Sequence, residues 1–140
     1  MPLLGEMSYR LVPDSLIRNQ MSRQVAAGSP RLPDQFVDDF RAMTFESFKR
    51  SRNDSISYTE AHPPAQTLAA ARVPLLVVVG AKDRIVNPAS AAVWRRVAGA
   101  TVDVMRRVGH TPQWERAAAL APLITRFARS HGAARCHASM

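Results

Sequence analysis

The feature that most constrains the fold of this 140-residue chain is an unbroken aliphatic run, VPLLVVV, at residues 73–79. Valine and leucine without intervening polar residues are typical of a strand buried on both faces, as in a parallel sheet. A second strand is predicted at 101–108, where Val102 and Val104 share one face. Because a helix is predicted between the two strands, at about 88–98, we expect them to run parallel as one strand–helix–strand unit.

The rest of the chain is predicted to be mainly helical. A last helix is expected at about 113–130, with a buried stripe of Leu120, Ile124 and Phe127. Proline, glycine and apolar spacing divide the part before the first strand into four stretches. These are a helix closed by a left-handed Gly28, a second helix, an ambiguous polar stretch, and a short helix or turn, at about 14–27, 33–51, 52–62 and 63–72.

These patterns divide the chain into a helical segment at 1–72, an α/β segment at 73–131 and a frayed tail at 132–140. Two parallel strands cannot form an independent sheet that is covered on both faces, so further strands must lie beside them. The sequence holds no other strong strand candidate. We therefore expect an exposed sheet edge, which favours pairing with another chain or aggregation.

Charge is distributed unevenly along the sequence, whose net charge is +8. Residues 1–72 carry nine Lys or Arg against eight Asp or Glu, whereas residues 73–140 carry ten against three. The basic half could face an anionic partner, an acidic protein surface, or only solvent. We do not expect a nucleic-acid partner, because the sequence lacks a zinc finger, an RNA-recognition motif and basic strands interleaved with aromatic residues.

Cysteine content and hydropathy exclude further classes. The single cysteine, Cys136, offers neither a disulfide framework nor a metal cluster, so no metal or cofactor is predicted. The longest apolar run is too short to span a bilayer, and the opening MPLLGEMSYR lacks the pattern of a secretory signal. We expect a cytoplasmic globular protein that does not associate with membranes.

Two residues with catalytic potential follow the predicted strands. Asp83 comes just after the first strand, in VVVGAKDRIV, and His110 follows the second strand 27 residues later, in RRVGHTPQWE. The carboxyl ends of parallel strands meet at one edge, where sites in open α/β sheets collect. A histidine there can accept a proton from a hydroxyl group, and a carboxylate on its other ring nitrogen fixes its tautomer. The preceding glycines, Gly80 and Gly109, are expected to permit sharp turns.

From VPLLVVVGAKDRIV to VGHTPQWERAAALAPLITRF, residues 73–130 resemble the C-terminal part of the α/β-hydrolase family. The resemblance implies that Asp83 is the triad acid and His110 the triad base, in the family's order of acid before histidine. Glu115, at the start of the last helix, is also usual in that family. Residues 1–72 are similar to the family's cap, which lies over the active site, and Trp114 is a candidate for the substrate pocket wall.

The nucleophile of that family is missing from the sequence. It belongs to a Gly-x-Ser-x-Gly elbow between a strand and a helix, and no serine here lies in that pattern. Ser130, in ARSHG, comes nearest, but it follows the histidine and has no strand before it. Ser90 is interpreted as a first-turn residue of a helix.

Three functional hypotheses follow. The first is a hydrolase of an ester or similar carbonyl substrate, with a Ser–Asp–His mechanism, of which this chain is the C-terminal half. An aspartate nucleophile, as in epoxide hydrolases and dehalogenases, stays open within it. The second is a non-catalytic remnant that binds a partner chain or a small apolar ligand, and the third is a basic module for anionic partners.

The first hypothesis sets the expected partners. It implies an apolar small-molecule substrate and either a complementing N-terminal half or a second copy of the chain. Without a nucleophile, the chain by itself is expected to be inactive.

Overall fold

The computed structural model describes residues 2–136, which form two compact units. Within the described residues, the first unit comprises 2–23 and 30–64, and the second comprises 24–29 and 65–136. Residues 24–29 and 65–72, which precede the α/β segment in the sequence, therefore belong to the unit that contains the strands.

The first unit is helical and packs around aromatic rings. Tyr9 contacts Phe40, Phe45 and Phe48, with ring centroids 4.8, 5.9 and 5.7 Å away. The buried hydroxyl of Tyr9 donates a hydrogen bond of 2.9 Å to the carbonyl oxygen of Phe40, so the cluster leaves this polar atom satisfied. The helices are α1 (Pro2–Arg10), α2 (Asp14–Ser22), α3 (Gln35–Ala42) and α4 (Phe45–Ala61).

The prediction of one helix at 33–51 is wrong, because the chain leaves the helical conformation between α3 and α4. Met43 is extended, and the side chain of Thr44 accepts a hydrogen bond from the backbone N–H of Ser47 at 3.1 Å, which caps a new helix. Helix α4 then continues to Ala61 through the polar stretch left ambiguous above. None of its residues is buried.

The first predicted helix is also shorter than expected. Helix α2 ends at Ser22, and Gly28 lies six residues beyond it with a φ of +82°. The backbone N–H of Ser29 donates to the carbonyl oxygen of Ala26 at 3.1 Å, so residues 26–29 form a turn that places glycine at the left-handed position. Gly28 therefore shapes this turn and does not close the helix.

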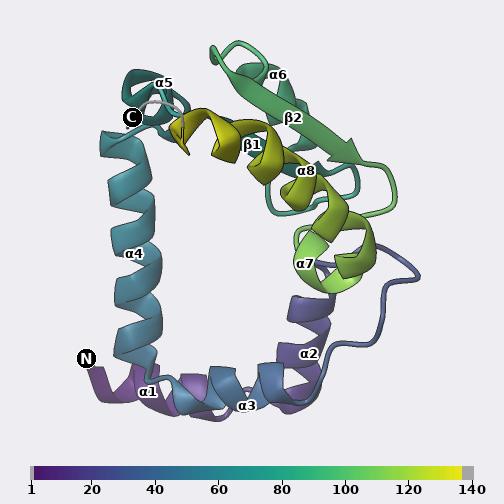
Figure 1. Cartoon of the computed structure of the whole chain (residues 1–140). Helices are drawn as coiled ribbons and strands as arrows, with labels where there is room; N and C mark the ends of the chain where they lie inside the picture. The colour runs from purple at the N-terminus through teal and green to yellow at the C-terminus, as the bar shows by residue number, and fades with distance from the viewer. Residues whose placement is uncertain (1, 137–140) are drawn as a thin grey trace. The chain divides into compact units, whose positions relative to one another are not determined.

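The second unit contains the strand–helix–strand arrangement that the sequence predicts (Figure 1). The strands pair in parallel, with a register from Leu75 opposite Ala100 to Gly80 opposite Met105. The helix between the strands is shorter than predicted, since α6 ends at Trp94. The elements are α5 (Pro64–Ala71), β1 (Leu75–Gly80), η1 (Pro88–Ser90), α6 (Ala91–Trp94), β2 (Ala100–Met105), α7 (Pro112–Glu115) and α8 (Ala117–Cys136).

The predicted burial of the first strand on both faces holds only at its carboxyl end. Val79 and Gly80 are buried, whereas the first four residues of β1 are half-buried. The sheet of the described residues has two strands, so each strand keeps one unpaired edge. The most tightly packed part of the sheet is therefore the end from which the site loops leave.

The last predicted helix divides at Arg116 into α7 and α8. Ile124 is 50% exposed, which contradicts its place in the buried stripe, while Leu120, Leu123 and Phe127 are half-buried. Helix α8 continues to Cys136, within the stretch where a frayed tail is predicted, and residues 137–140 of that stretch lie outside the described residues. No helix in the part described is long and apolar enough to cross a membrane.

Candidate functional site

The loop after β1 positions Asp83 through its own backbone. Oxygen Oδ1 of Asp83 accepts hydrogen bonds from the backbone N–H groups of Ile85 at 2.7 Å and Val86 at 2.9 Å. The N–H of Asp83 donates to the carbonyl oxygen of Gly80 at 3.1 Å. The side chain is only 7% exposed, so the loop fixes this carboxylate and leaves Oδ2 for another partner.

That partner is His110, on the loop after β2. Its Nδ1 lies 2.9 Å from Oδ2 of Asp83, and its backbone N–H donates to the carbonyl oxygen of Gln24 at 2.7 Å. The imidazole is 36% exposed, and Nε2 makes no hydrogen bond to any described residue. The structure thus brings together the two residues that the sequence predicts, 27 positions apart, as an Asp–His pair with one ring nitrogen available.

The environment of Asp83 keeps it ionised. Burial raises the pKa of its carboxyl group, but the hydrogen bonds from His110 and from the backbone of Val86 and Ile85 outweigh burial, so the pKa lies below its ordinary value of 3.8. An ionised carboxylate at this position favours the Nδ1–H tautomer of His110 and stabilises the imidazolium ion.

Gly80 and Gly109 allow close backbone contacts beneath the pair. A Cβ atom on Gly80 would lie 1.9 Å from the carbonyl oxygen of Gly109, and one on Gly109 would lie 2.5 Å from that of Gln24. Neither glycine has a positive φ, which the structure reserves for Gly28 and Gly99 among its described glycines. The chain turns directly after Gly80, and glycine is required at both positions for space and not for a left-handed conformation.

Glu115 is a buried anchor for the loop that carries His110. Its side chain is 4% exposed and accepts hydrogen bonds from three backbone N–H groups and two hydroxyls. Burial raises the pKa of this carboxyl group, but the hydrogen bonds lower it by more, so the pKa lies below its ordinary value of 4.5. The donors, at 2.7 to 3.2 Å, are the N–H groups of Ala26, Gly109 and Thr111 and the hydroxyls of Ser29 and Thr111.

The hydrogen bonds of Glu115 explain the position of residues 24–29 in the second unit. Ala26 and Ser29 are joined by this one carboxylate to Gly109 and Thr111, which flank His110 on either side. The sequence analysis noted Glu115 only through the family resemblance. A lone glutamate near a histidine gives no sign in the sequence that it accepts five hydrogen bonds.

A cavity of about 270 Å³ opens beside the Asp–His pair. Apolar side chains of β1 and the ring of Trp94 line it together with Asp83 and His110. Ser90 also lines it, and its Oγ is buried without a hydrogen-bond partner among the described residues. The sequence predicts Ser90 as a first-turn residue of a helix, and Trp94 lies within the helix predicted at about 88–98, so neither is predicted at the site. Their location in the helix that follows the Asp83 loop was the available signal for a place at the site.

Trp114, a candidate for the pocket wall, and Ser130, the serine nearest to an elbow pattern, are not among the residues that line this cavity. Trp114 is 37% exposed and does not line this cavity, which Pro112 and Gln113 of the same helix do. Ser130 lies in α8, where its hydroxyl donates to the carbonyl oxygen of Phe127 at 3.0 Å. Residues 2–136 contain no group of three His, Cys, Asp or Glu that could hold a metal ion.

Comparison with known proteins identifies the family of this chain. Residues 3–123 match the model of the alpha/beta hydrolase family. A crystal structure of a serine hydrolase involved in carbazole degradation, the CarC enzyme, is similar with a TM-score of 0.64 at 14% identity, over 82% of this chain and 46% of that one. A putative lipase from Acinetobacter baumannii is similar with a TM-score of 0.58 at 18% identity, over 89% of this chain and 46% of that one.

The chain thus spans less than half the length of these two structures. A search of curated protein sequences finds no match.

Proposed function

Because the chain belongs to the alpha/beta hydrolase family, we propose that it supplies the acid and the base of a hydrolase that cleaves an ester or a similar carbonyl substrate. The observation that carries the proposal is the 2.9 Å contact between Nδ1 of His110 and Oδ2 of the buried Asp83. If the Asp83–His110 pair only stabilised the fold, Nε2 of His110 would not need to lie beside a cavity without a hydrogen-bond partner among the described residues.

In the proposed reaction, Nε2 of His110 takes the proton of a serine hydroxyl as the serine oxygen attacks the carbonyl carbon of the substrate. The imidazolium returns that proton to the departing alcohol, and an acyl-enzyme forms. Water then attacks the acyl group, gives its proton to Nε2, and the serine leaves with that proton. Asp83 stays ionised throughout and stabilises the imidazolium, in agreement with its lowered pKa.

We place the nucleophile in a polypeptide segment outside this sequence. Ser90 is near His110, but its Oγ is buried and makes no hydrogen bond to the imidazole. Ser130 is hydrogen-bonded within α8 and does not line the cavity. An aspartate nucleophile in the missing segment would use the same Asp–His pair, and the serine mechanism is our choice because it needs the proton acceptor at Nε2 in its first step.

The remaining parts of the chain receive matching roles. We assign the helices of the first unit to a cap segment that takes part in selecting the substrate. Val77, Val79 and Trp94 give the site cavity an apolar wall, which supports an apolar acyl or ring group in the substrate.

The test uses a chain that joins this sequence to the segment encoded directly upstream of it. We expect that segment to contain a strand, a Gly-x-Ser-x-Gly elbow and a helix, and the joined chain to react with a fluorophosphonate and to hydrolyse p-nitrophenyl esters. His110→Gln should lower kcat by about 10⁴-fold or more, because serine and histidine act as a unit. His62→Gln, at the exposed end of α4, is the matched control and should leave kcat unchanged.

Three results would contradict the proposal. An elbow-containing chain whose esterase activity survives His110→Gln would remove the histidine from the mechanism. Fluorophosphonate labelling of the isolated chain that disappears in Ser90→Ala would place the nucleophile within this sequence. If no elbow is encoded upstream and no activity is found, the non-catalytic partner-binding remnant replaces the hydrolase.

A further inference from the structure

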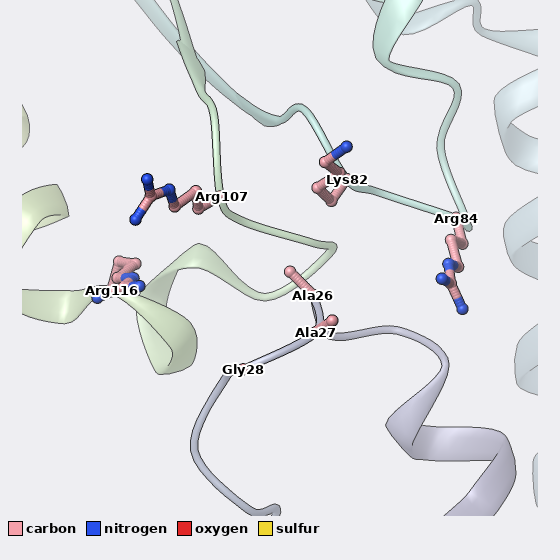
Figure 2. Close-up of a pocket in the computed structure, with 7 residues that line it drawn as sticks. All are labelled: Ala26, Ala27, Gly28, Lys82, Arg84, Arg107 and Arg116. Atoms are coloured by element: carbon pink, nitrogen blue, oxygen red, sulfur yellow. The ribbon is translucent and has the colours of Figure 1, made fainter.

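A second cavity of the same unit, of about 450 Å³, is basic. No acidic residue is among the described residues that line it. Its wall includes three small residues of the turn after α2, which leave space for a ligand. The lining residues are Ala26, Ala27, Gly28, Lys82, Arg84, Arg107 and Arg116 (Figure 2).

The four cations lie on three loops around the turn. Figure 2 shows Arg107 and Arg116 on one side of the backbone of residues 26–28, and Lys82 and Arg84 on the other. Lys82 and Arg84 belong to the loop after β1, and their neighbour Asp83 instead faces His110. The basic cavity is thus distinct from the site cavity, although one loop contributes to both.

The framework of this cavity is held by hydrogen bonds within the unit. The backbone N–H of Lys82 donates to the carbonyl oxygen of Val108 at 2.8 Å, which joins the loops after the two strands. Glu115 accepts hydrogen bonds from the backbone of Ala26 and Gly109, which joins the turn to the second of these loops. The backbones that carry the cations are therefore fixed before any ligand binds, which lowers the entropic cost of binding.

The positive charge of this cavity is not neutralised within the described chain. None of the four cations makes an ion pair with a described carboxylate. Asp83 is engaged with His110, and Glu115 with backbone N–H groups. Asp103 lines a neighbouring cavity together with Arg107 and Arg116, but it forms no ion pair with either among the described residues. Like charges around one concave surface repel each other, and a bound anion would relieve that repulsion.

We propose that this cavity binds a small ligand through its phosphate groups. Arginine presents planar, paired donors that match the oxygens of a phosphate, and Arg107 with Arg116 supplies two such groups on one side of the turn. Lys82 and Arg84 add positive charge on the other side of the turn. A diphosphate carries more negative charge than a phosphate, and we therefore expect it to bind more tightly. The site is independent of the hydrolase activity proposed above.

The test measures binding of inorganic phosphate and of diphosphate to the purified chain by isothermal titration calorimetry, with chloride holding the ionic strength constant. We expect saturable binding of both, with diphosphate the tighter. The double substitution Arg107→Gln with Arg116→Gln should weaken both affinities by about tenfold or more. Arg126→Gln with Arg129→Gln on α8 removes the same charge outside the cavity and should leave both affinities within about twofold.

A second pair of variants tests the two-sided arrangement. Lys82→Gln with Arg84→Gln should weaken the binding of diphosphate more than that of phosphate. All six positions that are changed here are exposed, and circular dichroism verifies that each variant is folded.

Three results would overturn the proposal. The first is the absence of saturable phosphate and diphosphate binding above the effect of chloride. The second is an equal loss of affinity in the α8 control, which would show that net charge alone is measured. The third is binding of polyglutamate without binding of phosphate or diphosphate, which would make the cavity a contact surface for an acidic protein segment.

Discussion

The two units of this chain are stabilised by different kinds of interaction. The first unit is stabilised by an aromatic cluster around Tyr9, whereas the residues of α4 are not buried. The second depends on backbone groups that converge on one buried carboxylate, Glu115. Apolar clusters tolerate substitutions that change the shape of a side chain. Loss of a buried carboxylate, in contrast, leaves several hydrogen-bond donors without an acceptor. The second unit should therefore be the more sensitive to single substitutions.

The chain carries natural probes that separate the two units. Both tyrosines, Tyr9 and Tyr58, lie in the first unit, and both tryptophans, Trp94 and Trp114, lie in the second. Tryptophan fluorescence and tyrosine absorbance during unfolding in urea therefore report on different units.

The largest effect is expected from Glu115→Ala. Removing this carboxylate leaves the buried N–H groups of Ala26 and Gly109 without an acceptor, at a cost of about 1–3 kcal/mol each, so the free energy of unfolding should fall by about 3 kcal/mol or more. The tryptophan transition should shift more than the tyrosine transition. Glu60→Ala, at an exposed position of α4, is the control and should shift neither. Equal shifts of both probes would show that the units do not differ.

A smaller loss is expected from Gly109→Ala. The added Cβ would lie 2.5 Å from the carbonyl oxygen of Gln24, and backbone atoms must move to avoid it, which costs about 1–3 kcal/mol. Gly132→Ala, in a helical stretch of α8 where an added Cβ meets nothing within 4 Å, should be neutral or stabilising. If Gly109→Ala were also neutral, the close approach of residues 24–29 to this loop would be wrong.

Acid should destabilise the second unit more than the first. The second has two carboxylates that accept several hydrogen bonds each, whereas in the first the pKa of Glu6 is lowered by a hydrogen bond from the backbone N–H of Phe45. The pKa values of Asp83 and Glu115 are lowered by folding, so their stabilisation is complete above their ordinary values of 3.8 and 4.5 and is lost as the pH falls through the lowered values. Tryptophan fluorescence should therefore detect unfolding below about pH 4. In Glu115→Gln, part of this acid dependence should disappear. An acid transition identical to that of the unmodified chain would show that Glu115 does not contribute to it.

The smallest effect is expected in the first unit, from Tyr9→Phe. The substitution keeps the ring contacts and removes one hydrogen bond, to the carbonyl oxygen of Phe40, so stability should fall by about 1 kcal/mol. The absorbance of Tyr58 then reports this unit alone, and the tryptophan transition should stay in place. A loss larger than that of Glu115→Ala would reverse the comparison.

The sequence predicts the second unit better than the first, for a physical reason. A continuous aliphatic strand, a parallel partner and the loops that follow them are local patterns, and they suffice to bring Asp83 and His110 together. In the first unit, the single polar cap of Thr44 interrupts an apolar periodicity that otherwise continues, so one long helix is predicted where two form.

Contacts between distant parts of the chain are the other source of error. Residues 24–29 join the second unit because Ala26 and Ser29 bind Glu115, which is 89 and 86 positions away. No periodicity or spacing in the sequence reveals such a contact. Ser90 and Trp94 follow the Asp83 loop in the sequence, but their place in the site cavity also depends on tertiary packing.

The central claim is that Asp83 holds His110 ready to act as a base, and nitrogen NMR of the protein labelled with ¹⁵N-histidine tests it most directly. We predict that neutral His110 carries its proton on Nδ1, that this proton is protected from exchange, and that Nε2 is unprotonated. In Asp83→Ala the proton should move largely to Nε2, the nitrogen that a free neutral histidine prefers. A His110 that is already protonated on Nε2 in the unmodified chain, with no change in Asp83→Ala, would contradict the account.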